Sequence, residues 1–242
     1  ATLTVSKPSN LANDDLLVAI VMSRNSAGTI TAPTNWVSLT SANGNGTQAA
    51  FAKYVTSASA ETATSYSFTA SSAARGIAII FRVTGAHPTA YLDAAGAATT
   101  SGTSSIVDPA VTAVNSTALL IAYYASHATS STVPVAGTAS GMTQVSNVSV
   151  VSGATASDVE IDSQALAAAG STGTRTSTVS PAAASASGFA FTIVPGGVME
   201  HYVTLFDSLF LPQGLRYICL WSVTLVPIPC GYCAWMTKCM MR

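Results

Sequence analysis

The sequence predicts an all-β protein, and over residues 1–195 a two-sheet antiparallel β-sandwich of the jelly-roll type, built from two pseudo-repeated halves. Three observations predict this fold. Short segments with strand character recur along the chain. Gly- and Asn-containing turn signals separate them. No window combines the apolar stripe of a helix with capping residues.

The predicted strands are of two kinds. Nearly continuous apolar runs, typical of strands buried on both faces, occupy residues 15–22, 76–83 and 118–124. Alternating or aromatic-containing runs, typical of strands with one buried face, occupy residues 50–55, 65–69, 159–162 and 188–194. The intervening turn signals lie at residues 43–46, 84–85, 101–102, 140–141, 152–153 and 170–173.

The order of these segments repeats. An apolar strand, a Pro-containing turn, two further strands and a final strand follow one another in residues 1–100 and again in residues 101–195. Leu16 and Leu119, which open the two apolar strands, are 103 residues apart. Because each half supplies only four or five strands, we expect the halves to pack together as one sandwich. The alternative to an internal repeat is that the strands of any β-sandwich resemble one another, so that the shared order of segments does not indicate a repeat.

The composition excludes some classes of function. Charged residues make up 8% of the chain, against roughly 25% in an ordinary soluble protein. The formal net charge is −1, so no basic face is expected to neutralise phosphates, and the sequence predicts no binding of nucleic acid. A surface solvated by Ser and Thr hydroxyls is common in particles and in secreted surface proteins.

Three carboxylates form the strongest candidate site. Asp158, Glu160 and Asp162 alternate along one strand, so their side chains share one face. They form a candidate calcium site, because carboxylate oxygens are the ligands that calcium prefers. The alternative, which we favour, is a solvated outer face with Val159 and Ile161 pointing into the core, because no Gly-bearing ligand loop accompanies the acids. No other cofactor is expected.

Catalytic signatures are missing from the sequence. His87 and His127 are the only histidines in residues 1–195. No Gly-x-Ser-x-Gly elbow links a strand to a helix, and the sequence therefore predicts that the protein is not an enzyme. Several aromatic residues are candidates for a sugar-stacking platform, but core packing is the favoured interpretation. They are Trp36, Tyr66, Tyr91, Tyr123 and Tyr124.

The Ser-, Thr- and Ala-rich composition of the sandwich ends at residues 195–197. The tail, residues 196–242, is not expected to form an independent domain or to belong natively to the sandwich. All four cysteines of the chain lie in the tail, and they are Cys219, Cys230, Cys233 and Cys239. The Cys-x-x-Cys pair among them lacks the strand–helix context of a redox motif. The four together are a weak match to a zinc site. Residues 215–236 are apolar, but Arg216 and two prolines within them argue against a membrane span.

The tail also carries a resemblance of its own. Residues 199–207 resemble the opening of a bacterial glycosyltransferase-like family, and the resemblance fails after Gly214. The codons of Trp235, Met236 and Thr237, read in the shifted frame, encode two aspartates. The shifted codons before them permit an apolar run, as in the same family. We therefore interpret the tail as the frameshifted start of a neighbouring gene and assign it no transferase activity.

The sandwich resembles a group of β-sandwich proteins of tailed phages and prophages, encoded among virion or tail genes. The motifs that carry the resemblance lie at residues 14–19, 33–36, 76–83, 108–112 and 115–120. The family's usual Gly before the Trp is Asn35 here, a residue that tolerates positive φ. The motifs are structural and bring no functional residues with them.

The resemblance implies a phage virion or tail-associated structural or binding module without catalysis. Its location would be the virion or the extracellular space, and its partners would be other virion proteins or a host-surface glycan, with no membrane. We expect it to act as a homo-oligomer or as an appendage of a larger chain. The alternatives are a carbohydrate-binding or cell-surface adhesin domain and, less favoured, a glycan-cleaving enzyme.

Overall fold

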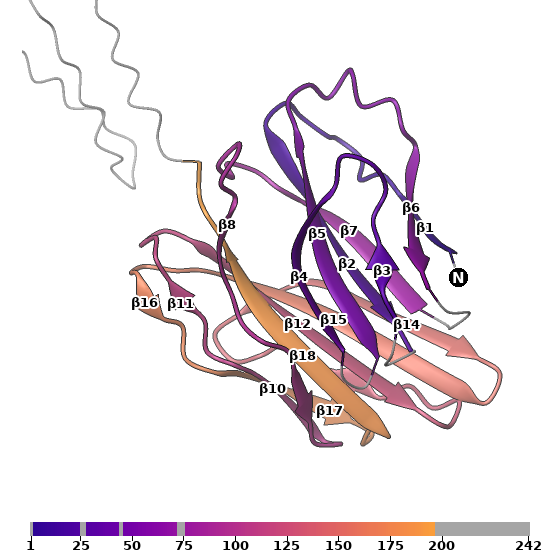
Figure 1. Ribbon diagram of the computed structural model, residues 1–242. Helices are drawn as coiled ribbons and strands as arrows, with labels where there is room; N and C mark the ends of the chain where they lie inside the picture. Colours follow the sequence, from indigo (N-terminus) through magenta and orange to yellow (C-terminus); the bar gives the residue numbers. More distant parts are fainter. Residues whose placement is uncertain (1, 25–27, 44–45, 72–75, 197–242) are drawn as a thin grey trace, which may run out of the picture. The chain divides into compact units, whose positions relative to one another are not determined.

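The computed structural model describes residues 2–24, 28–43, 46–71 and 76–196 (Figure 1). Every regular element in these ranges is a β-strand, and every pairing between neighbouring strands is antiparallel. The predicted all-β antiparallel sandwich is confirmed. The chain forms a compact unit over Ala1–Gly196, and the predictions about the tail concern residues 197–242, which lie outside the described residues.

Two sheets build the first half. The larger has the order β4-β5-β2-β7 and the smaller β1-β6-β3. The strands are β1 (Thr2–Ser6), β2 (Asp15–Ser23), β3 (Ile30–Thr31), β4 (Val37–Asn43), β5 (Thr47–Val55), β6 (Ser65–Ala70) and β7 (Gly76–Val83). Sequence periodicity located β2, β5, β6 and β7, whereas β4, with two Ser and an Asn among its seven residues, lacks the apolar signal.

The second half repeats this plan. Its larger sheet has the order β14-β15-β12-β18-β8, with β9 also paired to β18, and its smaller sheet has the order β10-β17-β13. The strands are β8 (Leu92–Ala95), β9 (Thr99–Ser101), β10 (Ser105–Asp108), β11 (Thr112–Ala113), β12 (Leu119–Ala128), β13 (Val135–Ala136), β14 (Thr143–Ser152), β15 (Thr155–Ala165), β16 (Gly170–Ser171), β17 (Arg175–Ser180) and β18 (Ser185–Ile193). Because β8 and β9 pair with β18, the second half begins before residue 101.

The two halves correspond strand by strand. Replacing β1, β2, β3, β4, β5, β6 and β7 by β10, β12, β13, β14, β15, β17 and β18 converts the sheet orders of the first half into those of the second, to which the second half adds β8 and β9 beside β18 and a two-stranded sheet, β11-β16. The correspondence extends to local detail, because β4 and β14 each have a register shift against their neighbour, at Leu39 and at Val145. The repeat in the sequence is therefore a repeat of the fold.

The sandwich has four layers rather than the two that we expected. The large sheets face each other in the middle, and each small sheet covers the outer face of its own large sheet. An aromatic-rich core fills the first half between β2 and β6, and a second core lies between β12 and β17. The strands of the outer layers are short, and although alternation predicted β6 among them, it did not show that they form separate layers.

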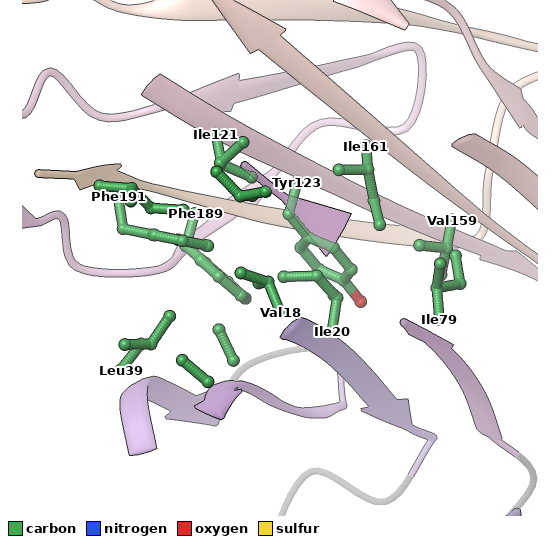
Figure 2. Packing of buried hydrophobic residues seen from close by; sticks show 14 of the residues in the cluster. Val18, Ile20, Leu39, Ile79, Ile121, Tyr123, Val159, Ile161, Phe189 and Phe191 are labelled. Atoms are coloured by element: carbon green, nitrogen blue, oxygen red, sulfur yellow. The ribbon is translucent and has the colours of Figure 1, made fainter. Parts of the chain in front are cut away.

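The central core joins the two halves. Val18 and Ile20 of β2 face Ile121 and Tyr123 of β12 across it (Figure 2). This arrangement explains the continuous apolar runs: β2 is buried along its whole length because both its faces are covered. Burial of apolar surface stabilises the folded state by roughly 25 cal/mol per Å², so the contact between the halves is a main source of stability.

One polar contact crosses the central core. Nε2 of Gln48, on β5, donates a hydrogen bond to Oγ of Ser187, on β18. Both residues are buried, and a buried polar group that loses its partner is costly. The pair therefore favours one alignment of the two large sheets over others.

Candidate functional site

The three carboxylates singled out from the sequence are buried inside the second half. Asp158, Glu160 and Asp162 do share one face of β15, and each is 0% exposed. Val159 and Ile161 point the other way, into the central core, as predicted. The interpretation of the acids as a solvated outer face is wrong, because β13 and the chain that follows it cover this face of β15.

Asp158 is held by three neighbours. Its carboxylate accepts hydrogen bonds from Oγ of Ser149 at 2.6 Å, from the backbone N–H of Ala136 at 2.8 Å and from Nδ2 of Asn147 at 3.3 Å. Burial raises the pKa of Asp158, and the charge of Glu160 raises it further, while these hydrogen bonds lower it in part. The net result is a carboxyl with a raised pKa.

Glu160 and Asp162 are neighbours with different surroundings. Both oxygens of Glu160 lie 2.9 Å from Nε2 of Gln144, and Oγ1 of Thr138 donates at 3.1 Å. Asp162 receives one bond, at 2.7 Å from the backbone N–H of Ala139, and its Oδ1 has no partner among the described residues. Burial raises the pKa of Asp162 to about 7, with a further contribution from Glu160.

A fourth carboxylate, not anticipated from the sequence, approaches from the outer sheet. Asp108 ends β10, is 0% exposed, and has no hydrogen-bond partner for either oxygen within the described ranges. A Cβ placed on Gly188 would lie 2.0 Å from Oδ1 of Asp108, so only glycine fits opposite it. Burial raises the pKa of Asp108 well above its usual value, and the charge of Asp162 adds to this effect.

We call these four residues, Asp108, Asp158, Glu160 and Asp162, the buried acid cluster. They are all the acidic residues of residues 101–195. Two further side chains belong to their surroundings. Tyr124 is buried, and the charges of Asp108, Asp162 and Glu160 raise the pKa of its hydroxyl beyond the effect of burial. Arg175 is the sole Lys or Arg between residues 83 and 196.

Arg175 does not neutralise the cluster through a direct ion pair. Its Nη2 donates to Oε1 of Gln164 at 2.6 Å and its Nη1 to the carbonyl of Thr174 at 3.2 Å. The two ion pairs formed by described residues, Lys53–Glu61 and Arg82–Asp15, both lie in the first half. The cluster is therefore an excess of buried acids with one nearby cation.

The candidate calcium site has no support in the geometry. Within the described residues, no group of three or more His, Cys, Asp or Glu side chains is arranged to hold a metal ion. The carboxylates of β15 instead point to separate donors on β13, β14 and the chain after β13. These donors bond every carboxylate oxygen of the three β15 acids except Oδ1 of Asp162, which has no partner among the described residues.

The other sequence candidates are structural or locally bonded. Nδ1 of His87 accepts the backbone N–H of Ala90 at 2.9 Å, which stabilises a turn. Oγ of Ser185 lies 2.6 Å from Nδ1 of His127, but no carboxylate among the described residues bonds that ring. Burial and the charge of Arg24 lower the pKa of His127.

The aromatic residues are mostly core. Trp36 packs edge-on against Tyr66 at 5.0 Å and Phe68 at 5.4 Å between ring centroids. Tyr123 stacks on Phe189 at 4.7 Å. Of the five candidates for sugar stacking, Tyr91 is partly buried and the others are buried, so they do not form an exposed row.

Comparison with known proteins gives no family. No protein-family model, curated protein or solved structure matches the chain. In the part of the chain that the structure describes, no helix is long and apolar enough to cross a membrane. The resemblance to phage proteins therefore stays a prediction.

Sequence reasoning missed Asp108, Tyr124 and Arg175 as neighbours of the carboxylates. One signal was available: residues 101–195 contain four acids and a single basic residue, which is unusual for a solvated surface. A second signal was the spacing of Ile106 and Asp108, because residues two apart on a strand share a face. An apolar Ile106 on that face indicates that Asp108 also points towards the interior. Neither signal identifies which strands of the outer sheet cover β15.

Proposed function

We propose that this protein is a structural or binding module of a phage virion or tail, without catalysis. The observation that carries the proposal is the inaccessibility of the acids. General acid–base and glycosidase chemistry require carboxyl groups that reach a substrate, whereas the four acids of residues 101–195 are all 0% exposed. A four-layer body whose central sheets are covered on both sides suits a rigid structural role.

The edge of the larger sheet of the second half supports a role in assembly. β14 forms that edge and, among the described strands, pairs with β15 alone. It is ten residues long and contains no charged residue or proline, the features that usually protect an edge strand from pairing. Val145, Val150 and Val151 are exposed along it. We infer that β14 pairs with β14 of a second copy, because two uncharged strands meet without like-charge repulsion.

The test combines location with activity. Phage particles purified from the culture that carries the gene should contain the chain when their proteins are identified by mass spectrometry. The purified full chain should release no reducing sugar from glycan substrates. Binding to a glycan array without hydrolysis would favour the host-surface glycan as its partner.

Two outcomes would contradict the proposal. Hydrolysis of a glycan by the purified chain would establish an enzyme, provided that the activity disappears when a single acidic residue is replaced. Absence of the chain from particles that contain the other virion proteins would exclude a virion role.

A further inference from the structure

We propose that the outer sheet β10-β17-β13 packs most tightly on the larger sheet of the second half while carboxyls of the buried acid cluster keep their protons, so that raising the pH loosens this layer and acidification tightens it. The inference does not depend on the proposed function. It assigns to the second half a pH-sensitive interior that the first half lacks.

The geometry places acids on both sides of one layer contact. Asp108 comes from β10 in the outer sheet, and the other three acids come from β15 in the large sheet. Tyr124 of β12 is the titratable neighbour of the cluster, because the charges of Asp108, Asp162 and Arg175 all act on the pKa of its hydroxyl. The groups that β14 supplies, such as Gln144, Asn147 and Ser149, are neutral.

Four negative charges in this interior would strongly destabilise the folded state. Burying an ionised carboxylate without a partner is very costly, so the group keeps its proton instead. Gln144 and Thr138 donate to Glu160, whereas Oδ1 of Asp162 and both oxygens of Asp108 receive no hydrogen bond in the described structure. Asp108 and Asp162 are therefore the members that hold protons.

The direction of the effect follows from proton linkage. Burial raises the pKa of Asp162 to about 7 and that of Asp108 well above its usual value, whereas both titrate near about 4 in an unfolded chain. Above pH 4 the folded state thus binds more protons than the unfolded state. Stability falls as the pH rises from about 4 towards 7, and the raised pKa of Asp108 adds to this decline.

The first half shows that the fold does not require these acids. The strand registers place Phe51 of β5 at the position of Asp162 of β15, since Ala19 pairs with Phe51 as Ala122 pairs with Asp162. Phe51 stacks on Phe68 at 5.7 Å in an apolar interior. The same layer contact thus exists in one half with aromatic residues and in the other with acids.

The experiment measures unfolding of the full chain by urea at pH 5 and pH 8, at constant salt, with circular dichroism. The equilibrium constant of unfolding should be at least about tenfold larger at pH 8, because one such carboxyl changes it by up to about tenfold per pH unit. Asp162→Asn, which removes the titration and keeps the shape, should reduce this difference. Hydrogen exchange, corrected for its intrinsic pH dependence, should show a larger loss of protection in β10 and β17 than in β2.

Asp93→Asn is the matched control. Burial would raise the pKa of Asp93, but hydrogen bonds from Asn115, Val114 and Thr192 more than offset it and lower the pKa. Its charge is therefore complete above pH 5, and the variant should keep the wild-type difference between pH 5 and pH 8. A wild type equally stable at both values, or an Asp162→Asn variant with the full difference, would overturn the proposal.

A second measurement covers the case in which Asp162→Asn does not fold. The carboxyl carbons of wild-type Asp side chains, followed by NMR, should include at least one resonance that titrates near pH 7. If every Asp resonance of the folded protein titrates below pH 5, the proposal is wrong.

Discussion

At the scale of single residues, the two halves form the same turn with different amino acids. Asn35 has φ 68° and Gly141 has φ 76°, and each precedes a residue whose N–H bonds back three positions, Trp36 to Pro33 and Met142 to Ala139. The left-handed conformation costs a residue with a Cβ roughly 1–2 kcal/mol, and Asn tolerates it better than most. The residue before the Trp was therefore interpreted correctly from the sequence.

We expect substitutions at Asn35 to follow this backbone requirement. Asn35→Ala should lower the free energy of unfolding by about 1 kcal/mol, whereas Asn35→Gly should change it by only a few tenths. Gly141→Ala in the equivalent turn should cost about as much as Asn35→Ala. Urea unfolding of the three variants checks this, and equal stability of Asn35→Ala and Asn35→Gly would contradict it.

At the scale of elements, the long strands were predictable and the edges were not. Apolar runs in the sequence predict β2 and β12. No such run predicts β14, because the side chains that it turns towards the acids of β15 are polar and three of its valines face solvent. Its role as an uncharged edge becomes visible only once its neighbours are known.

The proposed pairing of β14 with a second copy predicts a dimer. Val151→Lys places a charge on the edge and should weaken self-association by about tenfold or more, equivalent to about 1.4 kcal/mol. Val114→Lys is the control, because Val114 is 73% exposed and lies outside the strands. Sedimentation velocity over a concentration series measures the effect. A wild type that stays monomeric would show that β14 does not mediate self-association.

At the scale of the whole molecule, the central core makes the two halves one folding unit. Ile20 and Tyr123 belong to opposite halves and to the same cluster. Each large sheet would expose an apolar face if the other half were removed. The sequence repeat therefore does not mean two independent domains.

Ile20→Ala should destabilise both halves together. The loss of a buried side chain and the cavity that remains should lower the free energy of unfolding by about 3 kcal/mol. Hydrogen exchange followed during urea unfolding should give one midpoint for β2 and β12, shifted equally. Val37→Ala, at a residue 53% exposed, should change stability by no more than about 0.5 kcal/mol. Separate midpoints for the two halves would contradict the single folding unit.

The sequence by itself determined where the main strands lie, where the chain turns and that the plan is repeated, because these depend on local periodicity and on the backbone preferences of Gly and Asn. It also determined that Asp158, Glu160 and Asp162 share a face. Only the tertiary structure decided that this face is buried. Alternation sorts side chains into two faces without saying which face another layer covers, and that layer, β10-β17-β13, is assembled from segments that precede and follow β15 in the chain.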